Sequence, residues 1–248
     1  LNLTTNGSFV VKGVEKWAHA LIPVLSDIKI SWNGASKESN EEIMRKSNWS
    51  LMINNLKTFL KIRDEYHHDK KASCSVTLQL TFLESNLTEL YDLIKMSIEL
   101  GIDRVKGHHL WAHFEEIKDL SMRRNEDSIK RWNVEVAKIF QLQKDMLLPS
   151  GKPIKLENFT ILDKNGETDL APGGSCPFLG KEAWVNPQGV FSPCCAPDEL
   201  RKKLGDFGNV NDVSIGEIWQ GKDYQNLQKN YLQYDLCKTC NMRKPLIQ

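Results

Sequence analysis

The hydrophobic and polar positions of the first two thirds of the chain follow two alternating periods. Residues 27–31 and 73–82 show the period of two that predicts a β-strand, whereas residues 41–64 place apolar side chains at the spacing of one long amphipathic helix. Further strands are predicted at residues 1–4, 104–106 and 152–157, and further helices at residues 14–21, 87–100 and 128–146. Because a parallel strand is reached only through a long crossover, this alternation predicts βαβ units and a parallel sheet, an α/β fold.

The composition of the sequence changes after residue 170. Residues 171–174 (Ala-Pro-Gly-Gly) have the composition of a linker, and the segment that follows holds five of the six cysteines. It also contains a hairpin signal at residues 184–191 and one predicted helix at residues 214–232. We therefore expect an α/β domain over residues 1–170 and a small α+β domain over residues 171–248.

Charge and hydropathy narrow the class of partner. The chain has 33 Lys and Arg against 32 Asp and Glu, so no net field draws it to nucleic acid or to anionic lipid. No apolar run approaches the roughly 18 to 20 residues that cross a bilayer, and no secretory signal is present. We expect a cytoplasmic protein whose partners are small molecules or proteins, not membranes or nucleic acids.

The cysteines of the C-terminal part have the spacing of metal ligands. The pattern is Cys-x12-Gly-x4-Cys-Cys, a gap of 41 residues, and Cys-x2-Cys, formed by Cys176, Cys194, Cys195, Cys237 and Cys240. A Cys-x2-Cys pair turns two thiolates toward one centre. Disulfides, a structural zinc and an iron-sulfur cluster all remain open, but the cytosolic character of the chain disfavours disulfides. The single Cys-x2-Cys pair and the lack of adjacent histidines favour a cluster over zinc. The spacing from Gly189 nominates Cys194, rather than Cys195, as the ligand.

This region resembles the SPASM/twitch extension of radical S-adenosylmethionine enzymes, which holds an auxiliary iron-sulfur cluster. No cysteine follows Cys240, so the resemblance is to the version with one cluster. It implies an auxiliary [4Fe-4S] cluster on four ligands, Cys176, Cys194, Cys237 and Cys240.

The first domain is similar to the barrel of the same enzymes. Residues 3–7 resemble the third barrel strand, and residues 28–34 resemble the fourth, although Asn33 stands where the family usually has Asp. The resemblance implies a partial (β/α)6 TIM-like barrel that binds S-adenosylmethionine. Ser31 would contact the ribose and Arg45, on the following helix, the methionine carboxylate. His108 and His109, after the sixth strand of the family, would contact the adenine or the substrate.

One family motif is missing. The Cys-x3-Cys-x2-Cys motif of the radical-generating cluster does not occur, nor do the first two barrel strands, so we expect a second [4Fe-4S] cluster on a preceding segment. The resemblance then implies a 5′-deoxyadenosyl radical that abstracts hydrogen from a peptide or small molecule. It also implies a reducing electron-transfer protein of flavodoxin or ferredoxin type. The alternative is a non-catalytic scaffold, derived from this fold and stabilised by zinc or a cluster.

Two further candidates remain undecided by the sequence. Glu157 ends a predicted strand and is either a general base or substrate anchor, or an ordinary surface carboxylate. His109 and His113 have helical i, i+4 spacing, which suits a metal pair, but no third ligand is evident.

Overall fold

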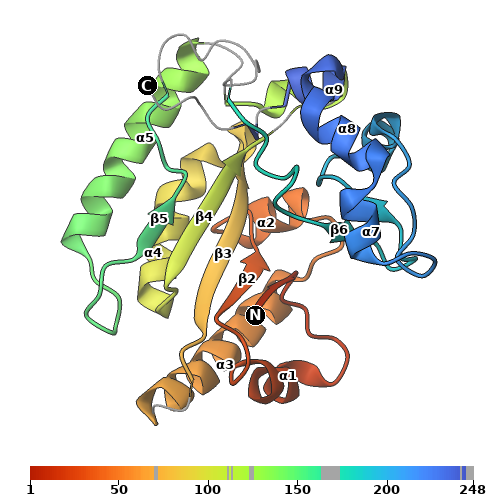
Figure 1. The fold of residues 1–248 in the computed structure, drawn as a ribbon. Coiled ribbons are helices and arrows are strands. Elements are labelled where there is room, and N and C mark those ends of the chain that lie inside the picture. Colours follow the sequence, from red (N-terminus) through yellow and green to blue (C-terminus); the bar gives the residue numbers. More distant parts are fainter. Residues whose placement is uncertain are drawn as a thin grey trace. The chain divides into compact units, whose positions relative to one another are not determined.

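The chain forms two compact units, Leu1–Thr168 and Asp169–Gln248 (Figure 1). The structure, a computed structural model, describes residues 1–69, 72–110, 112, 114–122, 126–162, 174–240 and 242–243. The predicted linker at residues 171–173 and the candidate ligand His113 lie outside these ranges. None of the described helices combines the length and the apolar character needed to cross a membrane.

The first unit is built on a five-stranded sheet in which every neighbouring pair is parallel. Its strands run in chain order: β1 (Asn2–Thr5), β2 (Asp27–Ser31), β3 (Ser75–Phe82), β4 (Arg104–His109) and β5 (Lys155–Glu157). The registers are continuous across the sheet; Ile30 pairs with Leu78, which pairs with Val105. The parallel α/β sheet predicted from the alternating pattern is therefore confirmed.

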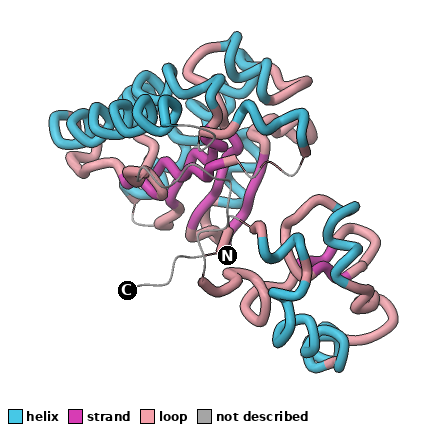
Figure 2. Tube along the Cα trace, turned by 90° about the horizontal axis from the view of Figure 1, so that it is seen from above, coloured by secondary structure: helices cyan, strands magenta, loops and turns pink. Residues whose placement is uncertain are grey.

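Helices connect the strands and cover one face of this sheet (Figure 2). They are α1 (Gly13–Leu21), α2 (Lys37–Ile43), α3 (Trp49–His68), η1 (Glu84–Glu89), α4 (Leu90–Leu100), η2 (Glu115–Leu120) and α5 (Glu126–Asp145). Gly101 ends α4 in the left-handed conformation, with φ of 77°, as the sequence signal for a helix end requires.

The single helix predicted over residues 41–64 is wrong. The structure divides it into α2 and α3, because Lys46 adopts a left-handed conformation with φ of 67°. Asn48 then starts α3 as its N-cap, and its side chain accepts a hydrogen bond from the backbone of Leu51 at 2.9 Å. Met44, just after α2, and Trp49 and Met52, in α3, all pack on the first unit's core, so the apolar pattern did not reveal the break.

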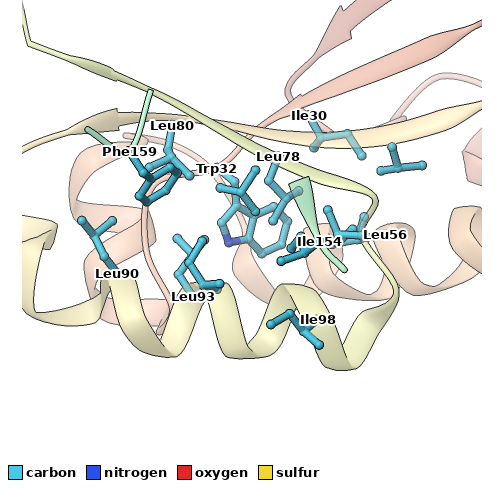
Figure 3. Close-up of a cluster of buried hydrophobic side chains, with 14 of the residues drawn as sticks. Ile30, Trp32, Leu56, Leu78, Leu80, Leu90, Leu93, Ile98, Ile154 and Phe159 are labelled. Carbon is cyan, nitrogen blue, oxygen red and sulfur yellow. The ribbon is translucent and has the colours of Figure 1, made fainter. Parts of the chain in front are cut away.

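Alternate strand positions supply the apolar side of the core. Ile28, Ile30, Val76 and Leu78 are at most 1% exposed. Figure 3 shows strand side chains meeting those of α3 and α4, among them Ile30, Leu78, Leu80, Leu56, Leu90, Leu93 and Ile98. The apolar face of the sheet is thereby removed from water, which is the main favourable contribution to the stability of this unit.

An aromatic cluster closes this core at the C-terminal end of β3. The ring of Phe82 lies 4.6 Å from Trp132 and 4.9 Å from Phe159, measured between centroids. It passes over Gly107 of β4, where a Cβ atom would overlap the Phe82 ring. Glycine at 107 is therefore a packing requirement, not a turn signal.

The second unit is small and has a core of its own. It contains β6 (Trp184–Val185), β7 (Phe191–Ser192), α6 (Asp198–Arg201), η3 (Lys202–Leu204), α7 (Ile215–Gln220), α8 (Lys222–Asn230), η4 (Tyr231–Gln233) and α9 (Asp235–Lys238). Strands β6 and β7 form the predicted hairpin. The single helix predicted over residues 214–232 is instead two helices, because Gly221 is extended, with φ of −61° and ψ of 146°.

Candidate functional site

The face of the parallel sheet opposite the core is polar. Strand side chains alternate in direction, so the positions between the buried apolar residues share this second face. It carries Asp27, Lys29, Ser31, Thr77, Gln79, Thr81, Arg104, Lys106, His108 and Glu157. We call this set the polar sheet face. It includes two of the four residues predicted to bind S-adenosylmethionine, Ser31 and His108.

Arg104 organises the N-terminal part of the polar sheet face. Its Nη2 lies 2.8 Å from Asp27 Oδ2, and its Nη1 lies 2.7 Å from Glu157 Oε1. Its Nε donates to Thr77 Oγ1 at 2.9 Å, and that hydroxyl in turn donates to Asp27 at 2.8 Å. One guanidinium therefore connects four strands, β2 to β5.

The two carboxylates of this network are held ionised. Burial raises the pKa of Asp27, but hydrogen bonds from Thr77 and Ser75 and the charge of Arg104 outweigh it and lower the pKa. Burial likewise raises the pKa of Glu157, and Arg104 and Lys106 lower it below the usual range. A carboxylate stabilised as an anion is a poor proton acceptor, so this geometry does not support Glu157 as a general base.

His108 and His109 point to opposite faces of β4. The His109 ring packs on the core side, with centroids 5.1 Å from Phe82 and 4.6 Å from Trp132. His108 lies on the polar sheet face, where burial and the charge of Lys106 lower its pKa. Of the two histidines, His108 alone lies on the same sheet face as Ser31.

The tautomer of His108 follows from its neighbour Asn158. The side-chain amide of Asn158 donates to the carbonyl of Gly107 at 2.8 Å, which fixes its orientation. The same nitrogen lies 3.4 Å from His108 Nδ1, and an amide nitrogen can only donate. Nδ1 of His108 is therefore the acceptor, and the neutral ring carries its proton on Nε2.

Ser31 ends β2 and leads into a loop that wraps around Glu89. The Glu89 carboxylate accepts hydrogen bonds from the backbone of Ala35 at 2.8 Å and of Ser36 at 3.2 Å. The hydroxyls of Ser36 and Ser39 also donate to it. Burial raises the pKa of Glu89, but these hydrogen bonds outweigh it and lower the pKa. A single carboxylate thus fixes the start of α2.

Asn33, which replaces the usual Asp of the resembled motif, joins this loop to β3. Its Oδ1 accepts from the backbone of Thr81 at 2.8 Å, and its own backbone donates to Asn40 Oδ1 at 2.9 Å. Next to it, a Cβ on Gly34 would overlap the backbone and side chain of residues 39 and 40. Asn33 keeps the acceptor that an Asp would supply, without its charge.

Arg45 lies beyond the end of α2, in the exposed turn before α3. Within the described part of the chain its guanidinium has no hydrogen-bond or ion-pair partner. The prediction placed it on the helix that follows β2. The structure instead places it in the turn created by the break at Lys46.

All four cysteines that the spacing selected lie in the second unit. Cys176 lies in the turn after residue 174, Cys194 follows β7, Cys237 lies in α9, and Cys240 follows that helix. Burial raises the pKa of Cys237 to about 12, and the thiols of Cys194, Cys176 and Cys240 add to this rise.

Two backbone amides point at one of these sulfur atoms, that of Cys176. The N–H groups of Phe178 and Leu179 each donate to Cys176 Sγ at 3.5 Å. Burial raises the pKa values of Cys194 and Cys240, and the backbone opposes this rise through Ala196 at Cys194 and through Met242 and Arg243 at Cys240. Donors aimed at sulfur stabilise thiolates, the form in which cysteine binds metal.

Cys195 stands apart from this group. As a residue it is exposed. The largest cause of the raised pKa of its thiol is desolvation, and Cys176 is the only other cysteine that adds to the rise. Cys194, in contrast, also acts on Cys237 and Cys240 and packs against the core of the unit. The geometry therefore favours Cys194 over Cys195.

All six cysteines are free thiols, and no three described His, Cys, Asp or Glu side chains form a group that could hold a single metal ion.

The hairpin turn before Cys194 explains the glycine in the spacing pattern. Gly189 has φ of 83°, and a Cβ there would overlap the side chains of Asn209 and Asn211.

Residues 176–241 match a family model described as SPASM, an iron-sulfur cluster-binding domain. The resemblance to SPASM proteins is confirmed. We call residues 176–241 the SPASM region.

Solved structures similar to this chain are radical S-adenosylmethionine enzymes. Native anSMEcpe with bound AdoMet has 14% identity and a TM-score of 0.58, covering 97% of this chain and 64% of that one. Streptococcus suis SuiB has 14% identity and a TM-score of 0.61, covering 97% and 54%. SuiB bound to the precursor peptide SuiA has 13% identity and a TM-score of 0.57, covering 98% and 54%.

These likenesses establish the fold, that of a radical S-adenosylmethionine barrel with a cluster-binding extension. The chain spans only 54 to 64% of the length of the solved chains compared. None of the curated proteins matches it in sequence.

Sequence reasoning missed the residues that hold the candidate sites in shape. Glu89 was not singled out, because it is 50 or more residues from the serines and amides that it binds. Asn158 was missed as well, because its contact with His108 joins positions 50 residues apart. A signal was available for His109, since strand alternation assigns adjacent residues to opposite faces.

Proposed function

We propose that this chain forms part of a radical S-adenosylmethionine enzyme and holds an auxiliary [4Fe-4S] cluster on Cys176, Cys194, Cys237 and Cys240. The observation that carries the proposal is the set of four buried or half-buried free thiols in the second unit, one of which, Cys176, accepts two backbone N–H hydrogen bonds at sulfur. Such a group repels its own negative charge, so it requires a cationic centre to become four thiolates.

The arrangement favours a cluster over zinc. Four sulfur atoms on one zinc ion lie about 3.8 Å from one another, from a Zn–S distance of about 2.3 Å in a tetrahedron. A cube of iron and sulfide ions spreads its ligands further apart. The wide, unequal spacing of the four cysteines along the chain and the lack of histidines beside them support the larger centre.

S-adenosylmethionine is proposed to bind at the C-terminal end of the polar sheet face. Ser31 would contact the ribose, and Arg45 has an unused guanidinium fork that suits the methionine carboxylate. His108 offers an Nε2–H donor to an acceptor on the adenine or the substrate. Bound there with a radical-generating cluster, S-adenosylmethionine would supply a 5′-deoxyadenosyl radical that abstracts hydrogen from the substrate. The 248 residues lack the Cys-x3-Cys-x2-Cys motif, so the proposal assigns that cluster to a preceding segment.

A peptide is the proposed substrate, and the reaction is its oxidation or another modification. The support is the likeness to SuiB bound to the precursor peptide SuiA and to anSMEcpe bound to the Cp18Cys peptide. A reducing protein of flavodoxin or ferredoxin type is the proposed electron donor, because radical generation consumes an electron. A cytoplasmic location is proposed on the same grounds, since the cluster and thiols are stable in a reducing compartment.

Metal analysis of the anaerobically purified chain tests the cluster. We expect about four irons and four sulfides per chain, and little zinc. Cys237→Ala and Cys240→Ala should each lower the iron content and destabilise the SPASM region, because ligand binding contributes directly to folding. Cys194→Ala should do the same, whereas Cys195→Ala, one residue away, is the matched control and should keep its iron.

Three results would contradict the proposal. One zinc without sulfide would favour the structural scaffold instead. Full iron in Cys194→Ala together with lost iron in Cys195→Ala would exchange the two ligand assignments. Unchanged metal content in all four variants would mean that these cysteines do not bind the metal.

A further inference from the structure

Three consecutive backbone amides follow Cys176, in a segment (residues 176–180) that we call the Cys176 turn. Two of them donate to one acceptor and the third donates to another. Those of Phe178 and Leu179 donate to Cys176 Sγ, and the next one, of Gly180, donates to the hydroxyl oxygen of Tyr224 at 3.0 Å. Tyr224 lies on α8, 44 residues later in the chain. Its hydroxyl therefore fixes the end of the same turn whose amides face the sulfur.

Tyr224 is tightly packed, and its hydroxyl O–H is an unused hydrogen-bond donor within the described residues. The side chain is 1% exposed, and its ring packs at 5.1 Å from Phe191 and 5.2 Å from Trp219. The oxygen accepts from Gly180, but the O–H proton has no acceptor among the residues that the structure describes. A buried hydroxyl proton without an acceptor is costly, so a partner for it is expected at this place.

Gln228 presents a second unused donor at the same turn. It follows Tyr224 by four residues, so both side chains project from one face of α8. Gln228 Oε1 lies 2.7 Å from the place that a Cβ on Gly180 would occupy, and Gly180 is left-handed, with φ of 73°. The Nε2 atom of Gln228 is buried and has no hydrogen-bond partner within the described ranges.

We propose that Tyr224 and Gln228 position the Cys176 turn and donate hydrogen bonds to sulfur atoms of the cluster site, which raises the reduction potential of the bound cluster. The inference rests on the proposed function, since it presumes a cluster on Cys176. Thiolate and sulfide are the acceptors that the cluster site would supply to the two unused donors. Burial and the nearby thiols of Cys176 and Cys194 raise the pKa of Tyr224, so its hydroxyl stays protonated and able to donate.

The direction of the effect follows from charge. Reduction adds an electron to the cluster and makes its sulfur atoms better acceptors, so donors stabilise the reduced state more than the oxidised state. Removing one donor should therefore make the potential more negative. A tenfold change in the equilibrium constant for reduction corresponds to about 59 mV for one electron.

The test is a redox titration, followed by electron paramagnetic resonance, of the full chain with its cluster. Tyr224→Phe keeps the ring and removes the hydroxyl, and Gln228→Met keeps the length and removes the amide. We expect each to retain iron and to shift the potential to a more negative value, by about tenfold in the equilibrium constant. Tyr234→Phe is the matched control, because its ring packs on the same core but its hydroxyl has no partner at the Cys176 turn. It should leave the potential unchanged.

The outcomes separate this inference from the proposed function. If the unmodified chain holds no iron and sulfide, the proposed function itself fails. If the cluster is present and neither Tyr224→Phe nor Gln228→Met moves the potential more than Tyr234→Phe does, the inference is overturned and the ligand assignment stands. If Tyr224→Phe loses its iron, the positioning role is supported, and the potential of Gln228→Met decides the donor role.

Discussion

Arg104 and Asp27 are joined by an ion pair of 2.8 Å that crosses over an intervening strand of the sheet. The Asp27 side chain is 9% exposed, and that of Arg104 is 24% exposed. An ion pair so shielded from water interacts more strongly than one on the surface, and its loss leaves a buried charge uncompensated.

Replacing Arg104 should therefore destabilise the first unit. Arg104→Met keeps most of the length of the side chain but leaves Asp27 and Glu157 without their partner, so we expect a loss of about 2 to 3 kcal/mol. Urea denaturation measures it. Lys130→Met is the control, because its ion pairs with Glu126 and Asp127 are exposed and should contribute less than about 1 kcal/mol. Equal effects of the two variants would contradict this account of the network.

The same network predicts a dependence of stability on pH. The folded-state pKa values of Asp27 and Glu157 lie below the ordinary values of 3.8 and 4.5, so their contribution is present above those values. It is lost as the pH falls through the lowered folded-state values. We expect the free energy of unfolding to fall as the medium is acidified below these ordinary values.

Denaturation of Asp27→Asn over the same pH range checks the assignment. This variant cannot titrate at position 27, so its stability should fall less steeply in acid than that of the unmodified chain. An equally steep fall would place the responsible carboxylates elsewhere.

Glu89→Gln should loosen the loop that follows Ser31. The amide retains one acceptor oxygen where the carboxylate has two, and it loses the charge that strengthens the hydrogen bonds from Ala35, Ser36 and Ser39. We expect a loss of stability of about 1 to 3 kcal/mol and faster hydrogen exchange at the amides of residues 35 and 36. Glu99→Gln, on the exposed side of α4, should change neither.

Arg45→Ala should weaken the binding of S-adenosylmethionine without destabilising the fold. Its side chain is exposed and has no partner within the described residues, so the free energy of unfolding should stay within about 0.5 kcal/mol. Loss of a charge-assisted contact should weaken binding by about 1.5 to 3 kcal/mol, measured by calorimetry on the protein loaded with the clusters of the proposed function. Lys61→Ala, an exposed cation on α3, serves as the control. An unchanged dissociation constant for Arg45→Ala would refute its proposed role.

The sequence predicted those features that depend on local periodicity. Strand β2 was placed correctly at residues 27–31, because Ile28 and Ile30 alternate with polar side chains. The helix break at Lys46 was missed, since one left-handed residue leaves the apolar spacing almost intact. The cap at Asn48 was a signal for it that the periodicity concealed.

The candidate site likewise has features that a local sequence pattern predicts and features that it does not. The cysteine spacing selected four thiols that all lie in the second unit, and the left-handed turn at Gly189 that its pattern contains is encoded locally. The contact of Tyr224 with Gly180 joins positions 44 residues apart and depends on how α8 packs. No local pattern marks such a contact, and the same holds for the hydrogen bonds of Glu89.

The overlap of Gly107 with the ring of Phe82 links the evolution of the two positions. The ring of Phe82 fills the space where any side chain at 107 would begin, so residue 107 cannot gain a side chain while phenylalanine remains at position 82. A related chain that carries alanine or a larger residue at the position of Gly107 is expected to carry a smaller residue than phenylalanine at the position of Phe82. Substitutions at the pair should therefore be strongly epistatic: Gly107→Ala is tolerated only in a background where residue 82 has already become small.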